Sequence, residues 1–353
     1  MNSDKNIDRN VEKNGFPHSE HWYGKPYFSL DAYCKNTLGE KVYKIALDAG
    51  MTCPNRDGSI DTRGCIFCSA GGSGEFAVAP SDRKTDGKPD KNSIRASVQE
   101  QIITGTRLFE GRQTTHGKLS RKHTGHRFIA YFQSYTNTYA PVAYLKVLYD
   151  AALSEPCISG ISIATRPDCV SLEICDMLDQ LRQKYPDKFI WIELGLQTIH
   201  ESTAVYIRRG YPLSRFDRCM QLLHEHHIPA IIHVILGLPG ETADMIMETI
   251  QYLNHCNIQG IKLQLLHVLK GTDLCTDYEL GKFHVLSMDT YLDLVMECLS
   301  ILSPDMVIHR LTGDGSKSLL VAPLWSSNKR LVLNTLHKEM KQRNITQGCA
   351  YRP

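Results

Sequence analysis

The stretch VYKIALDAGMTCPNRDGSIDTRGCIFC, residues 42–68, joins a predicted β-strand to a loop that holds three of the chain's twelve cysteines. Its apolar beginning, 42–47, is typical of a strand. In the loop, eleven residues separate Cys53 from Cys65, and Cys65 forms a C-x-x-C pair with Cys68. Cysteines clustered in this way indicate metal ligands or reactive thiols when the surroundings are reducing.

Six predicted strands, this one included, alternate with predicted helices along the chain. We expect the strands at 42–47, 128–133, 158–164, 189–196, 230–236 and 261–268. We expect the helices between them at 94–109, 141–153, 171–184, 213–227 and 241–255. Apolar strands separated by helices predict right-handed βαβ units and a parallel sheet that is covered on both faces. About 230 residues of this repeat fit a complete or partial barrel better than two dinucleotide-binding domains.

The expected fold is therefore α/β, a partial (β/α)6 TIM-like barrel followed by a C-terminal α/β extension. We expect a disordered polar tail at 1–24 and the barrel at 25–270, with the cysteine loop at 53–68. The extension, 271–353, is expected to pack on the barrel and to be more structural than catalytic. Its predicted elements are a helix at 288–302, a strand at 306–311 and a helix at 329–341.

The composition excludes several classes of protein. A chain of 353 residues with 42% hydrophobic content can bury a full core. Lys and Arg number 40 against 38 for Asp and Glu, so the formal charge of +2 does not indicate a strongly basic or acidic binder. The first residues lack the apolar segment of a signal peptide, and no apolar run is long enough to span a membrane. We therefore expect a cytoplasmic protein with no membrane partner.

Polar residues lie at or near the end of each predicted strand. After the first strand come the cysteines, and the later strands carry Gln133 and Ser134, Arg166 and Asp168, Glu193 and Gln197, His233, and Gln264 and His267. Strand alternation places Glu193, Gly195 and Gln197 on one face. One such residue alone is usually a hydrogen-bonded structural group. Six sets at the carboxyl ends of parallel strands predict an active site, because barrel enzymes carry their chemistry there.

Three chemistries could use the three clustered cysteines. A structural zinc site normally takes four ligands, so His116 or His123 would have to complete it. A thioredoxin-like redox pair would use Cys65 and Cys68 and leave Cys53 without a role. An iron–sulfur cluster held by three thiolates would leave one iron open, as a catalytic metal leaves a position for its substrate.

The cysteine trio ending Cys-x-Phe-Cys, together with the strand–helix pattern, resembles the radical S-adenosylmethionine (SAM) superfamily. Within it, the chain is similar to the YhcC-like family, which is related to the radical SAM domain of the Elongator catalytic subunit. The segments that carry the resemblance are YFQSYTNTYAP at 131–141, TRPDC at 165–169, ELGLQT at 193–198, RRG at 208–210, HVILGLPGET at 233–242 and HRLTGDG at 309–315. The resemblance covers roughly residues 25–350. The gap after Cys53 is longer than in the commonest motif of the superfamily, C-x-x-x-C-x-x-C.

The resemblance implies roles for individual residues. Cys53, Cys65 and Cys68 would hold a 4Fe-4S cluster whose open iron is chelated by SAM, and Phe67 would lie beside the adenine. Gln133 and Ser134 stand where the superfamily has a motif for the methionine amino group, although the usual glycines are missing here.

Further residues of the resemblance complete the expected cofactor site. Gln197 and His233 would contact the ribose, and Glu193 belongs to the same set on the fourth strand. Arg209 would bind the methionine carboxylate, which suits its planar guanidinium group.

The implied function is reductive cleavage of SAM to a 5′-deoxyadenosyl radical, which abstracts hydrogen from an unknown substrate. The partners would be a reductant protein such as flavodoxin or ferredoxin and a small-molecule, peptide or tRNA substrate. Two alternatives stay open, a zinc-stabilised RNA-binding module and a radical SAM tRNA-modifying enzyme. The basic segment 112–127 could contact RNA phosphates. We nevertheless expect no tRNA binding at physiological salt.

Overall fold

The structure is a computed structural model that describes residues 19–72, 90–111, 127–313 and 315–353. Residues 1–18, which make up most of the predicted polar tail, lie outside the described part of the chain. So does most of the basic segment 112–127, including His116 and His123. Among the described helices, none is both long and apolar enough to cross a membrane.

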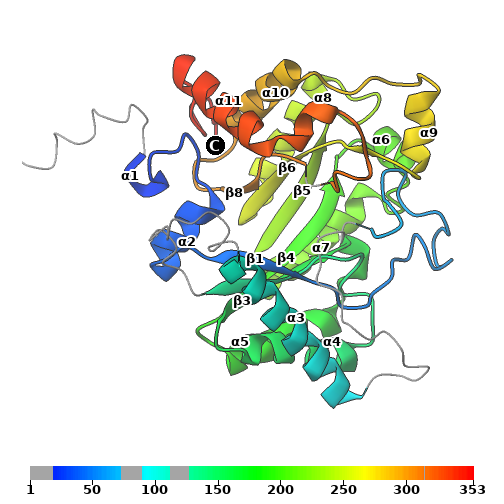
Figure 1. Cartoon of the computed structure of the whole chain (residues 1–353), viewed down its shortest axis with the longest axis vertical. Coiled ribbons are helices and arrows are strands. Elements are labelled where there is room, and N and C mark those ends of the chain that lie inside the picture. The colour runs from blue at the N-terminus through cyan, green and yellow to red at the C-terminus, as the bar shows by residue number, and fades with distance from the viewer. Residues whose placement is uncertain (1–18, 73–89, 112–126, 314) are drawn as a thin grey trace, which may run out of the picture.

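The centre of the molecule is a curled, seven-stranded parallel sheet (Figure 1). Its strands, in spatial order, are β1 (Tyr43–Leu47), β2 (Phe128–Phe132), β3 (Ile158–Thr165), β4 (Phe189–Gln197), β5 (Ala230–Leu236), β6 (Gly260–Leu265) and β8 (Val307–Arg310). Each strand pairs in parallel with its neighbour. The α/β partial barrel expected from the sequence is therefore confirmed, and β1 and β8 form its open edges.

Helices cover the outer face of the sheet (Figure 1). They include α3 (Lys91–Gly111), α4 (Val142–Ser154), α5 (Leu172–Lys184), α6 (Glu201–Tyr206), α7 (Leu213–Glu225) and α8 (Ala243–Asn254). The hydroxyls of Ser171 and Thr242 cap α5 and α8 by accepting backbone N–H bonds. Thr242 is thus the residue before α8, which begins two positions later than the sequence predicted.

Alternation along the strands separates an apolar outer face from a polar inner face. Outward side chains such as Ile192, Ile232 and Leu263 are fully buried against the helices. Inward side chains include Glu193 and Lys262, which are also almost fully buried. Since a charged side chain is costly to bury unpaired, the inside of the barrel must supply partners for both.

The C-terminal segment is part of the central sheet as well as packing against it. β8 pairs with β6 and adds a seventh strand to the six that were expected. The strand predicted at 261–268 ends earlier, and Val268–Leu269 forms β7, which pairs with β9 (Leu320–Ala322) in a second, antiparallel sheet. The helices of this part are α9 (Asp273–Glu279), α10 (Met288–Ile301) and α11 (Lys329–Gln342).

The N-terminal segment is held against the C-terminal one. Helix α1 (Ser19–Trp22) lies within the predicted tail 1–24, yet Trp22 is buried, so the folded part begins before residue 25. Helix α2 (Leu30–Leu38) follows, and the Phe28 backbone N–H donates to the side-chain oxygen of Gln347. The two ends of the described chain are therefore neighbours in space.

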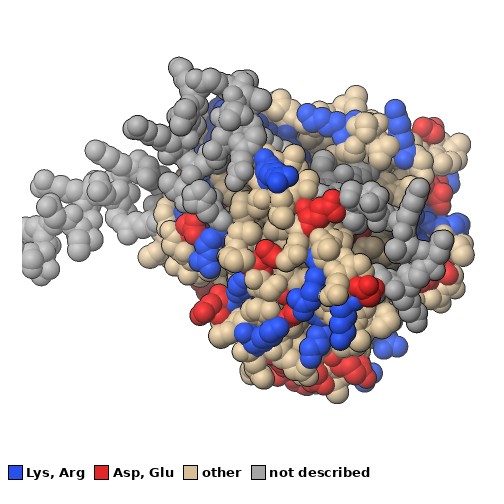
Figure 2. Space-filling model, turned by 60° about the horizontal axis from the view of Figure 1, so that its bottom comes forward, with Lys and Arg blue, Asp and Glu red and all other residues tan. Residues whose placement is uncertain are grey.

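Charged side chains on the helical face are mixed. Figure 2 shows Lys and Arg side chains lying among Asp and Glu side chains on the face turned to the viewer. Asp150 of α4 illustrates the pattern, since it pairs with Arg95 of α3 at 2.5 Å and with Lys184 of α5. Such pairs tie adjacent helices together and leave no large field of one sign on this face.

Candidate active site

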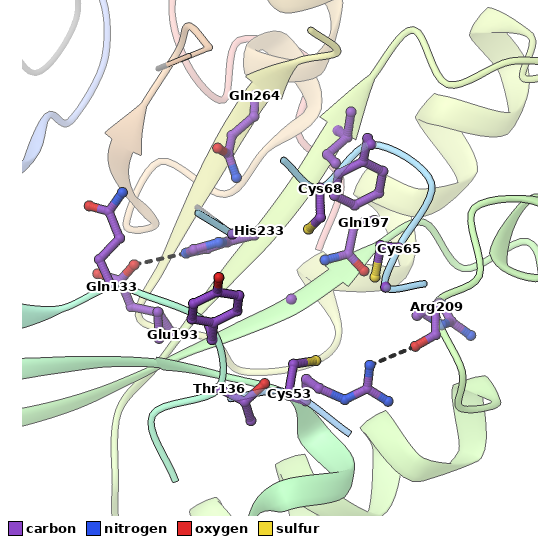
Figure 3. A pocket seen from close by; sticks show the side chains of 18 of the residues that line it. Cys53, Cys65, Cys68, Gln133, Thr136, Glu193, Gln197, Arg209, His233 and Gln264 are labelled. Atoms are coloured by element: carbon purple, nitrogen blue, oxygen red, sulfur yellow. Dashed lines mark hydrogen bonds and ion pairs between the residues drawn. The ribbon is translucent and has the colours of Figure 1, made fainter. Parts of the chain in front are cut away.

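A single pocket brings together the polar residues expected at the strand ends (Figure 3). Those that line it are Cys53, Cys65, Cys68, Gln133, Arg166, Glu193, Gln197, His233, Gln264 and His267. Ser134 is the exception, because it is buried beside the pocket and does not line it. Thr136, two residues further on, lines the pocket instead. Asp168 does not line the pocket either, but its carboxylate accepts two bonds from Arg166, which does. The other strand-end residues share one pocket, as the sequence predicted.

The cysteine loop is tied together by its own polar side chains. The Asn55 amide donates to the Arg208 carbonyl at 2.7 Å and contacts the Cys65 sulfur at 3.5 Å. The Arg56 guanidinium donates to the carbonyls of Cys68 and Ser69 at 3.0 and 2.6 Å. These bonds draw the two ends of a long loop together, so Cys53 can face the same pocket as the C-x-x-C pair.

Backbone bonds also fix the C-x-x-C pair to the barrel. The Ile66 N–H donates to the Ile207 carbonyl, and the Ile66 carbonyl accepts from Leu274. Ile66 is buried in a small apolar cluster, and Phe67 packs on the edge of that cluster while also lining the pocket. The aromatic residue expected beside the adenine is therefore at the pocket wall.

The three sulfurs share an electropositive environment. A hydrogen bond from Cys68 lowers the pKa of the Cys65 thiol, and the nearby charges of Arg166 and Arg208 lower it further. The same hydrogen bond and burial raise the pKa of Cys68. Of the two thiols, Cys65 is therefore the one that loses its proton more readily, and the thiolate is the form that binds metals.

The three thiols are of the residue type that holds an iron–sulfur cluster. Within the described ranges, no three His, Cys, Asp or Glu side chains converge closely enough to hold one metal ion. A zinc ion needs its ligands at about 2.0–2.3 Å from one point. The thiolates of an iron–sulfur cluster bind separate irons, so the three sulfurs that line the pocket need not converge on one point to hold a cluster.

Arg166 lies beside the cysteines and directly precedes the turn η2 (Pro167–Cys169). Its guanidinium makes two bonds to Asp168, at 2.9 and 2.8 Å, and a third to the Arg209 carbonyl at 2.9 Å. Only 8% of the residue is exposed, and that part faces the pocket. The sequence marked this position as polar but did not identify it as the cation next to the cysteines.

Arg209 uses its donors within the protein. Nη1 donates to the carbonyls of Thr198 and Leu196 at 2.7 and 3.3 Å, and Nε donates to Tyr211 at 3.0 Å. Nη2 lies 3.4 Å from a carboxylate oxygen of Glu201. The residue is only 2% exposed. Arg209 therefore holds the end of β4 in place, and the carboxylate contact that the sequence resemblance implies stays a prediction.

The end of β4 is shaped so that Gln197 faces the pocket. Its φ is +65°, and the pairing of β4 with β5 shifts register between Gly195 and Gln197. A Cβ at Gly195 would lie 2.6 Å from the Gln197 amide nitrogen, so a larger residue at 195 would displace that amide from its present position. This bulge presents Gln197 at the position expected for a cofactor contact.

Glu193 is the centre of a buried charge network at the floor of the pocket. Its carboxylate accepts hydrogen bonds from Lys44 at 2.7 Å, Ser162 at 2.5 Å and His233 at 2.8 Å, and it pairs with Lys262. Burial alone would raise the pKa of Glu193, but the charges of Lys262 and Lys44 outweigh it and hold the pKa well below its usual range. Glu193 is thus a fully engaged carboxylate.

Each strand of the sheet contributes one polar side chain to this floor. We define the floor layer as Lys44, Tyr131, Ser162, Glu193, His233, Lys262 and Arg310. The Tyr131 hydroxyl accepts from Lys262 at 3.0 Å, and His233, Lys262 and Arg310 are direct register partners on β5, β6 and β8. The sequence analysis missed five of these residues, because isolated polar residues inside apolar strands carry no local signal. They are Lys44, Tyr131, Ser162, Lys262 and Arg310.

Burial also determines the state of His233. It lowers the pKa to about 4, and the charge of Lys262 acts in the same direction. The imidazole is therefore neutral near pH 7. Since Nε2 faces the ionised Glu193 carboxylate (Figure 3), the proton resides on Nε2 and the unprotonated Nδ1 remains as an acceptor.

The chain matches two family descriptions over most of its length. The sequence model of the Radical SAM superfamily matches residues 62–253, and that of the Radical_SAM C-terminal domain matches residues 258–342. The chain is 40% identical over 338 residues to the uncharacterized protein YtqA of Bacillus subtilis, covering 96% of each. It is 30% identical to protein YhcC of Escherichia coli, covering 89% of this chain and 92% of that one. The chain therefore belongs to the radical SAM superfamily and is an enzyme.

The similarity to Elongator proteins is weaker and partial. Elongator complex protein 3 of Schizosaccharomyces pombe is 24% identical over 337 residues, which cover 87% of this chain and 60% of that protein. The solved structure of archaeal Methanocaldococcus infernus Elp3 superposes with a TM-score of 0.56 at 16% identity, covering 87% and 64% of the two chains. The chain thus spans about three fifths of the length of these Elongator proteins, and the structural likeness shows a shared fold.

Proposed function

We propose that Cys53, Cys65 and Cys68 hold a 4Fe-4S cluster and that the pocket binds SAM against it. When bound, the two groups supply a 5′-deoxyadenosyl radical, formed by one-electron cleavage of SAM, which abstracts hydrogen from a substrate. The chain's own residues position both molecules and exclude water from the reaction.

The observation that carries this proposal is the placement of the three thiols. They line one pocket together with Gln197 and His233, and no fourth cysteine among the described residues lines it. Three thiolates can bind three irons of a four-iron cluster, so one iron keeps an open position that faces the same pocket.

Individual residues then have separate tasks in binding SAM. Phe67 packs against the adenine. The Gln197 amide and His233 Nδ1 hydrogen-bond to the ribose. Gln133 binds the methionine amino group. Ser134 is buried behind Gln133 and is assigned no contact with the cofactor. Glu193 acts through His233, whose ring orientation it holds.

We assign the methionine carboxylate of SAM to Arg166 and not to Arg209. Arg166 lies beside the cysteine sulfurs and has donors beyond its three internal bonds. Arg209 has its donors on carbonyls and on Glu201. We therefore assign Arg209 as a positioning residue that supports the end of β4 and, through its carbonyl, Arg166.

The reaction also requires an electron from outside the chain. A reductant protein such as flavodoxin or ferredoxin would supply it to the cluster. The proposed substrate is a small molecule or a peptide, and a tRNA remains the alternative. The basic segment that would favour tRNA lies mostly outside the described residues.

Anaerobic reconstitution with iron and sulfide tests the proposal. We expect about four irons per chain, absorbance near 400 nm and release of 5′-deoxyadenosine when SAM and a reductant are added. Replacing Cys53, Cys65 or Cys68 by Ala should abolish cluster retention. Cys175→Ala is the matched control, because that thiol lies on α5 and is buried in the core. Stoichiometric zinc without iron would instead support the zinc-stabilised RNA-binding module, and a full cluster in Cys53→Ala would disprove the ligand assignment.

A further inference from the structure

Asn55 is a buried amide of the cysteine loop that is directed at a cysteine sulfur. Only 1% of the residue is exposed, and its side-chain nitrogen Nδ2 lies 3.5 Å from the sulfur of Cys65. This distance is that of a hydrogen bond, because sulfur is a larger acceptor atom than oxygen. Asn55 does not line the pocket, so a role toward the cofactors has to pass through Cys65.

A backbone bond brings Asn55 to Cys65 across the loop. The Gly64 N–H donates to the Asn55 carbonyl at 2.6 Å, and Cys65 is the next residue in the chain. Asn55 itself lies two residues after Cys53. The contact therefore joins the first cysteine of the loop to the C-x-x-C pair and places the Asn55 side chain beside the Cys65 sulfur.

The orientation of the Asn55 amide follows from its partners. Nδ2 donates to the Arg208 carbonyl at 2.7 Å and lies 3.3 Å from the Arg209 carbonyl. Carbonyl oxygens only accept hydrogen bonds, so the amide nitrogen, and not the amide oxygen, faces them and the neighbouring sulfur. The oxygen Oδ1 lies next to Gly210, where a Cβ would come within 2.5 Å of it, so a larger residue at 210 would displace the amide.

The Cys65 sulfur is positioned by the same backbone segment, 207–209. The Ile66 N–H, directly after Cys65 in the chain, donates to the Ile207 carbonyl at 3.1 Å. The Ile66 carbonyl accepts from the Leu274 N–H at 3.0 Å, in the first turn of α9. Donor and acceptor are thus both fixed to segment 207–209, so the N–H···S contact is in place before a cluster binds.

A hydrogen bond to a cluster sulfur changes the reduction potential of the cluster. The donor withdraws negative charge from the thiolate and so stabilises the additional negative charge that reduction places on the cluster. Outer partners of metal ligands act on the metal in this way. Because the amide carries no net charge, its effect is confined to the sulfur that it contacts.

We infer that Asn55 is a positioning residue that raises the reduction potential of the cluster through its hydrogen bond to Cys65. This inference rests on the proposed function, since it concerns how readily the same cluster takes up its electron. One electron passes from the reductant protein to the cluster, so the reductant is oxidised, the cluster is reduced, and Asn55 keeps its protons throughout. Asn55 therefore acts on the first step of the proposed reaction and not on the substrate.

Asn55→Leu tests the inference, because leucine has nearly the shape of asparagine but no N–H to donate. The reduction potential of the cluster is measured in the reconstituted full chain by redox titration followed by electron paramagnetic resonance. We expect a lower potential, with the ratio of reduced to oxidised cluster falling about tenfold at a fixed applied potential, which is about 59 mV for one electron. An unchanged or a higher potential would overturn the inference.

Ser59→Ala is the matched control within the same loop. The variant removes a side-chain bond to the Tyr139 hydroxyl at 2.9 Å, which involves no sulfur. We expect its reduction potential to equal that of the wild type. An equal fall in both variants would mean that loosening the loop, and not the lost bond to Cys65, changes the potential, which would contradict the inference.

A measurement on the wild type decides the case in which Asn55→Leu does not retain the cluster. The chain is prepared with asparagine that is isotope-labelled at the side-chain amide nitrogen, and pulsed electron paramagnetic resonance of the reduced cluster detects nuclei hydrogen-bonded to its sulfurs. We expect a coupling to the asparagine amide nitrogen, since Nδ2 of Asn55 contacts Cys65. The absence of this coupling would refute the hydrogen bond and the inference with it.

The outcomes separate this inference from the proposed function. If the wild type binds a four-iron cluster and Asn55→Leu has the same potential, the inference is wrong while the proposed function stands. If the wild type takes up no iron and sulfide, the proposed function fails, and the inference fails with it.

Discussion

Glu193 and His233 lie on neighbouring strands, β4 and β5, and share a hydrogen bond of 2.8 Å at the floor of the pocket. The same carboxylate also binds Lys44 and Lys262. These contacts determine both the charge of Glu193 and the orientation of the His233 ring. The pocket therefore depends on a network that runs across the sheet.

Replacing Glu193 by Gln should destabilise the protein strongly. The amide leaves the buried Lys262 and the partly exposed Lys44 without a counter-charge, and breaking a buried ion pair costs about 3–5 kcal/mol. Urea denaturation of the cluster-free chain measures the change. Glu297→Gln, on the exposed side of α10, is the control and should alter the free energy of unfolding by less than about 0.5 kcal/mol. If Glu193→Gln also changed the free energy of unfolding by less than about 0.5 kcal/mol, the network would not stabilise the fold.

His233 should make stability fall between pH 6.5 and pH 4. Its pKa is about 4 in the folded chain against an ordinary 6.5, so the unfolded chain takes up a proton first as the pH falls. Stability is therefore complete above pH 6.5 and is lost toward pH 4, by at most about 3 kcal/mol from this group. His267 titrates in the same window and in the same direction.

The contribution of His233 is isolated by comparison with His233→Gln, which keeps a donor for Glu193 but does not titrate. The free energy of unfolding of the cluster-free chain is measured at pH 7 and pH 5 for both proteins. We expect the wild type to lose more stability than the variant. Parallel curves would mean that His233 is not buried as a neutral ring.

Arg166→Gln should raise the pKa of the Cys65 thiol, because the charge of Arg166 is one of the groups that lower it. The rate of alkylation of Cys65 in the cluster-free chain, followed by mass spectrometry over pH 6–10, reports this pKa. The midpoint is expected to move to higher pH. Arg343→Gln, which removes a surface guanidinium, should leave the midpoint where it is. An unshifted midpoint in Arg166→Gln would place Arg166 too far from the sulfur to act on it.

Arg209→Ala should weaken SAM binding while the chain still retains its iron. The reason is indirect, because the variant loses the bonds to Thr198 and Tyr211 that hold the end of β4. We therefore expect Arg209→Lys to bind SAM as poorly as Arg209→Ala, since an ammonium cannot reproduce the three-sided contacts of the guanidinium. Calorimetry measures SAM affinity, and iron analysis measures cluster content. Substantial rescue by Lys would instead favour a direct charge contact with the carboxylate.

Much of the fold could be predicted because its signals are local. Apolar runs such as 158–164 and 230–236 read as strands without reference to the rest of the chain, and the structure places β3 and β5 there. The hydroxyl of Ser171 likewise marks the start of α5 in the sequence. The short strand β8 was expected as an element but not as a member of the central sheet, because pairing with β6 depends on a register between distant segments.

The candidate site also has features that follow from local sequence and features that depend on tertiary packing. The sequence by itself determined the cysteine trio and the polar strand ends, because spacing and strand alternation are properties of neighbouring residues. Only the tertiary structure decided that Ser134 is turned away from the pocket, that the Arg209 donors are occupied, and that Arg310 reaches the floor. These outcomes depend on which carbonyls and charges meet across strands. The partners of a buried guanidinium or carboxylate are set by the packing of distant segments, so they cannot be predicted from local sequence patterns.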